Sequence, residues 1–189
     1  MPMLEQRIQQ QFFDSADLKY QSAEALAKPI AEAAGALIGC ITAGGKVLVC
    51  GNGGSASDAQ HFAAEFVGRF ERERPGLAAI SLTTDTSILT AVGNDYDFSQ
   101  VFAKQVLALG QPGDVLLAIS TSGNSSNVIA ALAEARGRGL RTIALVGYDG
   151  GRVAGEDLAD HVIVTRSEHI PRIQEAQASA YHVLRELVG

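Results

Sequence analysis

The sequence predicts an α/β fold in which helices cover both faces of a five-stranded parallel sheet, with a helical arm ahead of the first strand. Two observations lead to this class. Short runs of consecutive apolar residues recur from residue 46 onward, and stretches with apolar residues at helical spacing separate them. Strands that are apolar throughout and alternate with helices are typical of a parallel sheet buried on both faces. We therefore expect a doubly wound, three-layer αβα sandwich.

The arm occupies residues 1–43, which contain no run of strand type. Its apolar residues recur at helical spacing and fit two helices, with Pro29 near a turn or kink: Ile8, Phe12, Phe13, Leu26, Ile30, Ala33, Ala34, Leu37 and Ile38. Ala43-Gly44-Gly45 ends the second helix. Because a three-layer core does not need an arm of this size, we expect it to pack on other subunits of a homotetramer.

The segments after the arm alternate between strand and helix within a single domain of residues 1–189. The predicted strands are 46–50, 78–81, 114–119, 141–147 and 161–165. The predicted helices are 56–71, 85–93, 98–109, 125–138, 153–158 and 168–188. The chain shows no internal repeat, low-complexity segment or linker that would divide it.

Composition narrows the classes of protein to consider. The 189 residues are 47% hydrophobic and only 19% charged, which favours a globular chain with part of its surface buried in an oligomer. A net charge of −6 gives no footprint for direct nucleic-acid or membrane binding. Cys40 and Cys50 are expected to be buried thiols. With no leader pattern and no apolar run of about 18 residues, the protein is expected in the cytoplasm.

A glycine-rich loop follows the first predicted strand. Gly51-Asn52-Gly53-Gly54-Ser55 leads directly into a helix, and free N–H groups at a helix N-terminus attract anions, phosphate above all. The pattern is neither the dinucleotide fingerprint nor the P-loop. The alternative is a tight turn that simply requires glycines.

A second loop of this kind follows the strand at 114–119. It reads Ser120-Thr121-Ser122-Gly123-Asn124-Ser125-Ser126-Asn127 and opens a helix, with Ser125 in the N-cap position. Its hydroxyls, its glycine and the helix N-terminus make a phosphate cradle that needs no lysine. Ligands of such sheets bind beyond the carboxyl ends of the strands, where both loops must lie. A serine-rich cap without a ligand is the alternative.

Beyond the first loop, His61 and Glu65 lie four residues apart on a predicted helix. At that spacing the two side chains project from the same face, about 40° apart. An imidazole and a carboxylate so placed can share a metal ion or a proton. The alternative is an ordinary surface pair.

Taken together, several motifs resemble a known family. The Ser120–Ser125 loop is similar to the phosphosugar-binding loop of sugar isomerase (SIS) domains, which implies a flavodoxin-like sandwich. The whole set resembles the sedoheptulose-7-phosphate isomerases, also called phosphoheptose isomerases: Gly44 to Leu48, Cys50 to Ser55, Asp58 to Phe62, Gly93 to Asp95, Ser120 to Ser125 and Arg172 to Glu175.

The resemblance implies roles for individual residues. The phosphate would be held by Ser120, Thr121, Ser122 and Ser125, and the sugar would be lined by Asn52, Gly53, Gly54, Ser55, Asn94, Asp95 and Gln174. Zinc, one ion per subunit, would be bound by His61, Glu65, Gln174 and His182. Glu65 would act as the base and His182 as the opposite acid or base. Gln174 and His182 are about 80° apart around a helix, so they share one pocket only if it is broad or the helix bends.

One position departs from the family pattern, because Gln177 stands where members commonly have a histidine. His161 and His169 match no family motif. The implied reaction is an aldose–ketose isomerisation of sedoheptulose 7-phosphate through an enediol, for heptose used in lipopolysaccharide or other glycans. Two other classes of protein match this chain less well. A tetrameric adaptor of the bacterial replication initiator lacks the groups matched by Glu65 and His182, and a sugar-phosphate-sensing regulator usually carries a DNA-binding domain.

Overall fold

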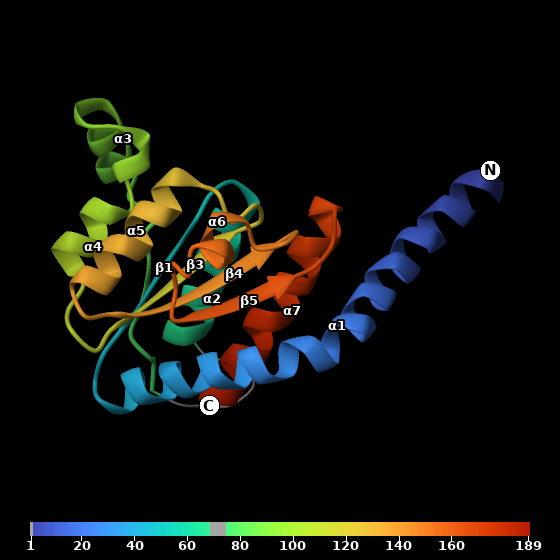
Figure 1. The fold of residues 1–189 in the computed structure, drawn as a ribbon, viewed down its shortest axis with the longest axis horizontal. Coiled ribbons are helices and arrows are strands. Elements are labelled where there is room, and N and C mark those ends of the chain that lie inside the picture. Colours follow the sequence, from blue (N-terminus) through green and yellow to red (C-terminus); the bar gives the residue numbers. More distant parts are fainter. Residues whose placement is uncertain (1, 69–74) are drawn as a thin grey trace.

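A computed structural model describes residues 2–68 and 75–189 of the chain (Figure 1). The strands are β1 (Val47–Gly51), β2 (Ala79–Ser81), β3 (Val115–Ser120), β4 (Arg141–Gly147) and β5 (His161–Thr165). The helices are α1 (Pro2–Thr42), α2 (Gly54–Val67), α3 (Thr86–Asp95), the 3-10 turn η1 (Phe98–Gln100), α4 (Ala103–Leu109), α5 (Ser126–Gly137), α6 (Gly151–Gly155) and α7 (Ile170–Val188). The last residues of the predicted helix 56–71 lie outside the described part of the chain.

The five strands form one parallel sheet in the order β2-β1-β3-β4-β5, which confirms the predicted class. Val47 pairs in register with Ala79 on one side and Val115 on the other. Strand order therefore reverses at β1, and the crevice between the carboxyl ends of β1 and β3 is the topological switch point where such folds bind ligands.

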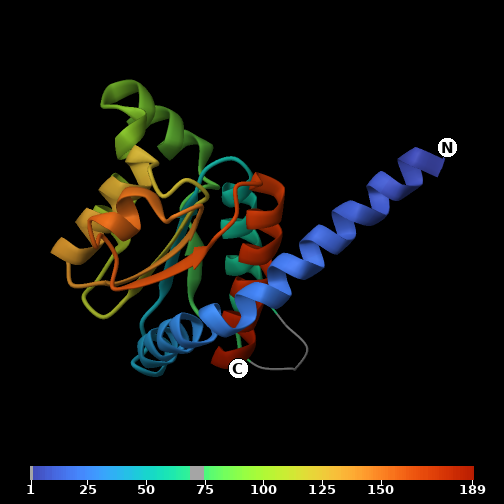
Figure 2. The same ribbon diagram turned by 45° about the vertical axis from the view of Figure 1, so that its right-hand side comes forward.

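Alternate residues of the strands face two separate cores. Val47 and Val49 pack with α1, α2 and α7, whereas Leu48 and Cys50 pack with α4 and α5 on the opposite face. This is the expected three-layer sandwich, and both views show α2 beside α7 on the same face of the sheet (Figures 1 and 2). Cys40 and Cys50 are buried free thiols, as expected, and burial raises the pKa of Cys50 to about 12.

The prediction of two helices in the arm is wrong, because α1 is continuous from Pro2 to Thr42 with Pro29 inside it. A proline removes one backbone hydrogen bond, and here the segment after it is held by packing: Ile30, Ala33, Ala34 and Leu37 are buried in the core. The N-terminal part of α1 projects from the body of the protein (Figures 1 and 2), whereas Ser22 and Leu26 line a cavity beside α7. Among residues 2–20, these large apolar side chains are exposed: Met3, Leu4, Ile8, Phe12, Phe13 and Tyr20.

Helix α1 also passes a length and composition test for a membrane span. One 18-residue window has a mean hydropathy of 1.3, although it contains no long unbroken apolar run, and 28% of that window is buried inside the structure. A core helix passes the same test, so this is weak evidence for a span.

The predicted helix 98–109 is also wrong as a single element. It is divided into η1 and α4, and the Asp97 carboxylate accepts a 2.7 Å hydrogen bond from the Ser99 backbone N–H at the start of η1. An aspartate that caps a short turn at this point favours a separate 3-10 segment over a continuous helix.

The amino-terminal edge of the sheet is closed by Asp114. Its carboxylate accepts hydrogen bonds from the Lys46 backbone N–H at 3.0 Å, the Lys46 ammonium at 2.6 Å and the Gln111 N–H at 2.8 Å. Burial opposes ionisation, but these bonds and the lysine charge outweigh it and lower the pKa of Asp114. The contacts between Asp114 and Lys46 hold the loop before β3 against the start of β1.

Candidate active site

The first loop brings the backbone close to its neighbours. Gly53 has a φ of 57°, which favours glycine, and a Cβ on Gly51 would lie 2.6 Å from the Ser55 carbonyl oxygen. A Cβ on Gly54 would lie 2.7 Å from the Gln174 Nε2. The structure therefore places the Gln174 amide directly against the first residue of α2.

The second loop is tied to the first by a pair of amides. Asn52 and Asn127 exchange two hydrogen bonds, each 2.8 Å between the Nδ2 of one and the Oδ1 of the other. Asn127 is buried, and it was not among the predicted site residues. Its position directly after Ser125-Ser126, with a side chain that hydrogen-bonds as well as the serines do, was a signal that could have identified it.

Two hydroxyls of the second loop face each other. The Oγ atoms of Ser120 and Ser125 are 3.0 Å apart, and Ser120 is buried. Ser125 does occupy the N-cap position of α5, but its side chain makes no cap hydrogen bond. Its hydroxyl therefore contributes to the loop surface and not to the helix.

A cavity of about 190 Å³ lies between the two loops, at the switch point of the sheet. It is lined by Asn52, Ser55, Ile119, Ser120, Thr121, Ser122, Ser125, Tyr148 and Ile170. Six of the residues predicted to bind substrate meet here, beside the N-terminus of α2 and that of α5. Neutral hydroxyls and two helix N-termini suit an anion.

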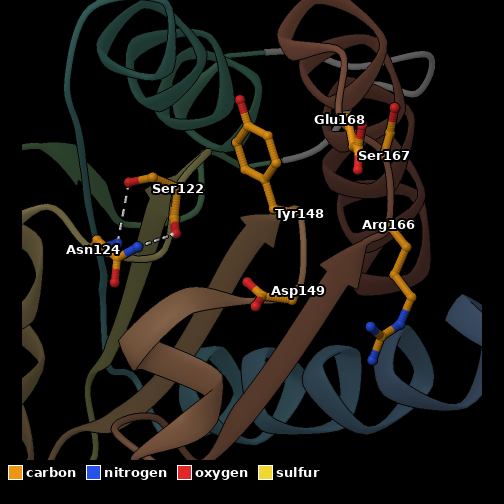
Figure 3. Close-up of a pocket in the computed structure, with 7 residues that line it drawn as sticks. All are labelled: Ser122, Asn124, Tyr148, Asp149, Arg166, Ser167 and Glu168. Atoms are coloured by element: carbon orange, nitrogen blue, oxygen red, sulfur yellow. Dashed lines mark hydrogen bonds between the residues drawn. The ribbon is translucent and has the colours of Figure 1, made fainter.

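A larger cavity of about 830 Å³ adjoins it and shares Ser122 and Tyr148 (Figure 3). Its other lining residues come from the loops after β3, β4 and β5: Asn124, Asp149, Arg166, Ser167 and Glu168. None of these residues, nor Tyr148 or Ile170, was among the predicted site residues.

Further along α2, His61 and Glu65 form a compact cluster with His182 of α7. The Glu65 Oε1 lies 2.9 Å from the His61 Nε2 and 3.3 Å from the His182 Nδ1. One ligand atom from each residue lies within 4.8 Å of the others. The Glu65 side chain is 14% exposed, whereas His61 and His182 are 52% and 41% exposed. The cluster therefore opens to solvent on the histidine side and buries its carboxylate.

Tyr181 packs against both histidines. Its ring centroid is 5.8 Å from that of His61 and 4.8 Å from that of His182, and its hydroxyl donates to the Asp58 Oδ1 at 3.3 Å. Burial and the Asp58 charge raise the pKa of Tyr181 to about 12, so it remains a donor at neutral pH. Burial also raises the pKa of Asp58. Sequence reasoning missed both residues, although Asp58 lies about one helical turn before His61 and Tyr181 directly precedes His182.

The remaining predicted residues lie outside these two groups or at their margin. Asn94 and Asp95 sit at the end of α3, where the Asn94 Nδ2 donates to the Asp95 Oδ1 at 2.9 Å; both are exposed, and neither lines the cavity between the loops. Gln177 is 1% exposed, and neither of its amide atoms has a hydrogen-bond partner among the described residues.

The fold and its two loops are those of a sugar isomerase domain, and the sequence model of the SIS domain family matches residues 11–147. A phosphoheptose isomerase from Methylibium petroleiphilum is 66% identical over all of this chain and 94% of its own. Solved phosphoheptose isomerases from Neisseria gonorrhoeae and Francisella tularensis superpose with TM-scores of 0.91 and 0.92, at 45% and 44% identity. These matches cover 98% and 100% of this chain, and 98% of each relative. The chain belongs to the phosphoheptose isomerase family of SIS domain proteins.

Proposed function

We propose that this protein is an aldose–ketose isomerase that converts sedoheptulose 7-phosphate to D-glycero-D-manno-heptose 7-phosphate. The observation that carries the proposal is the His61–Glu65–His182 cluster on the same helix face as the loop cavity. Gly54 and His61 are separated by about 10 Å along α2 and roughly 20° around it. A seven-carbon sugar with its phosphate at one end and its carbonyl near the other suits two sites arranged in this way.

The phosphate would occupy the cavity between the loops, held by Ser120, Thr121, Ser122 and Ser125. The helix N-termini of α2 and α5 add favourable dipoles without a formal positive charge. The sugar would extend from the phosphate towards the cluster and contact Asn52, Gly53, Gly54, Ser55 and Gln174. Binding energy from the remote phosphate would orient the reacting carbons.

In the proposed reaction, Glu65 removes a proton from C1 of the ketose while the C2 carbonyl oxygen takes a proton from His182. The resulting enediol then gains a proton at C2 and loses the proton of its C1 hydroxyl, which leaves an aldehyde at C1. The buried setting of Glu65 and the neighbouring imidazole provide the base and the acid that this proton transfer needs.

The donor set also fits a zinc ion. In a tetrahedral site with bonds of about 2.0–2.2 Å, ligand atoms lie roughly 3.3 to 3.6 Å apart. The separation from Glu65 to His182 is 3.3 Å, and that from Glu65 to His61, 2.9 Å, would widen slightly around an ion. His61, Glu65 and His182 would hold the ion. Gln174, whose amide lies against Gly54 about 10 Å along α2 from His61, would have to move to become a fourth ligand. When bound, zinc would polarise the sugar oxygens as a Lewis acid.

Quaternary structure forms part of this proposal. The exposed apolar side chains of α1 would be covered in a homotetramer, and Asn94 and Asp95 would reach a sugar only in the site of a neighbouring subunit. Residues 1–43 would then serve as the oligomerisation arm of a single SIS domain. A role in the cytoplasm, supplying heptose for lipopolysaccharide or another glycan, would follow from the substrate.

Incubation of the purified protein with sedoheptulose 7-phosphate, followed by NMR detection of the aldose, tests the activity. A Ser120→Ala, Ser125→Ala variant provides a matched control, because it removes two hydroxyls from the cradle and leaves the cluster intact. The proposal expects turnover in the wild type and a raised KM in the variant. Absence of turnover in an intact tetramer would favour the adaptor function instead.

A further inference from the structure

Tyr148 occupies a backbone conformation that tyrosine rarely adopts. Its φ is 53°, and the Gly150 N–H donates to the Gly147 carbonyl at 2.8 Å, so Tyr148 is the first central residue of a tight turn after β4. A positive φ at this position is normally supplied by glycine. A bulky residue held there indicates that its side chain has a use that offsets the strain.

The turn is locked onto the phosphate loop. The Gly147 N–H donates to the Thr121 carbonyl at 2.9 Å, and the Val153 N–H donates to the Gly123 carbonyl at 3.1 Å. A Cβ on Gly123 would lie 2.1 Å from the Gly150 carbonyl oxygen, so the two backbones are in direct contact. The Tyr148 backbone therefore keeps a fixed position relative to the hydroxyls of the loop.

The Tyr148 side chain lies at the boundary between two spaces. It lines both the 190 Å³ cavity between the loops and the 830 Å³ cavity beside it, and its ring extends from the end of β4 between Ser122 and the Ser167–Glu168 segment (Figure 3). The larger space is within the size range of small-molecule sites. Without the ring, a group attached to the far side of a bound phosphate would have room to enter it.

From these observations we propose that Tyr148 is a specificity-determining residue, whose ring restricts the loop cavity to a terminal phosphate and rejects a phosphate that carries a second substituent. The proposal rests on the function proposed above, since it assumes that the loop cavity binds the substrate phosphate. It concerns the shape of the ring and not its hydroxyl. A steric clash that excludes one ligand appears as a difference in affinity between two ligands, so both affinities must be measured.

Two ligands that share one end provide this measurement. Ribose 5-phosphate has a terminal phosphate, and ADP-ribose contains the same group with an adenosine phosphate added to it. Their dissociation constants are measured by calorimetry for the wild type, Tyr148→Gly and Tyr148→Phe. Tyr148→Phe is the matched control, because it keeps the ring and removes only the hydroxyl.

The wild type and Tyr148→Phe should bind ribose 5-phosphate at least about tenfold more tightly than ADP-ribose, and Tyr148→Gly should reduce that ratio to about one. Glycine suits a positive φ, so the thermal midpoint of Tyr148→Gly should equal or exceed that of the wild type. Tyr148→Asn tolerates the same backbone and provides a second small variant. An unchanged ratio in both small variants would overturn the proposal. If ribose 5-phosphate fails to bind the wild type, the phosphate site fails, and the proposed function fails with it.

Discussion

The Glu65 Oε1 and the His182 Nδ1 lie 3.3 Å apart, although Glu65 belongs to the helix after the first strand and His182 to the helix after the last. Helices α2 and α7 pack side by side on one face of the sheet, and further contacts fix them there. The Arg185 Nε donates to the Glu65 carbonyl at 3.0 Å, and the Tyr181 hydroxyl donates to Asp58 at 3.3 Å. The packing of two helices thus assembles a carboxylate and two imidazoles around one point.

Replacement of Glu65 with glutamine should lower kcat by roughly 10²- to 10⁴-fold, because the amide keeps the shape and removes the base. Steady-state kinetics and a thermal melt measure the two effects separately. Glu186→Gln, an exposed residue on α7, is the matched control and should retain wild-type turnover. Near-normal turnover by Glu65→Gln would show that Glu65 is not the base.

The metal site can be tested without activity. Zinc in freshly purified protein should approach one ion per subunit in the wild type and fall strongly in a His61→Ala, His182→Ala variant, because two of its best ligands are lost. His161→Ala removes a histidine that lies outside the cluster and should leave the zinc content unchanged. Equal zinc in the wild type and the double variant would refute the site.

The sequence predicted the sheet well because apolar runs report burial directly. Strands 141–147 and 161–165 were placed at the observed boundaries, and the loops after β1 and β3 were found from their glycines and hydroxyls. The continuous α1 was missed because the loss of one hydrogen bond at Pro29 is offset by packing, which no local pattern shows. Asn127, Tyr148 and Tyr181 were missed for a related reason, since each gains its position from contacts with distant segments.

Asp114 should make stability depend on pH. Asp114→Asn should lower the free energy of unfolding at neutral pH by about 1–3 kcal/mol, because it weakens a buried set of charge-assisted hydrogen bonds. The pKa of Asp114 is lowered in the folded state, so its contribution is present above the unfolded value of about 3.8 and is lost as pH falls through the folded pKa. Denaturant titrations should show the two proteins converging at acid pH. A constant difference down to that range would contradict this assignment.

The apolar face of α1 should be needed for assembly. Phe12 and Phe13 are 74% and 60% exposed, so their replacement with serine removes apolar surface without disturbing the core. Light scattering should give a mass four times the 19.8 kDa of the chain for the wild type and a smaller mass for the double variant. Gln9→Ser on the same helix should remain a tetramer. A wild-type protein that is a fully active monomer would rule out the arm's role.

Isomerisation in deuterated water provides the most direct test of proton transfer at C1 and C2 of the sugar phosphate by the Glu65 cluster. The protein is incubated with sedoheptulose 7-phosphate in D₂O, and the aldose is analysed by NMR for deuterium at C2. An enediol route with a base that exchanges with solvent predicts deuterium at C2 in the wild-type product, and little product of any kind with Glu65→Gln. Product formed at the wild-type rate by Glu65→Gln, or no aldose from the wild type, would contradict the account.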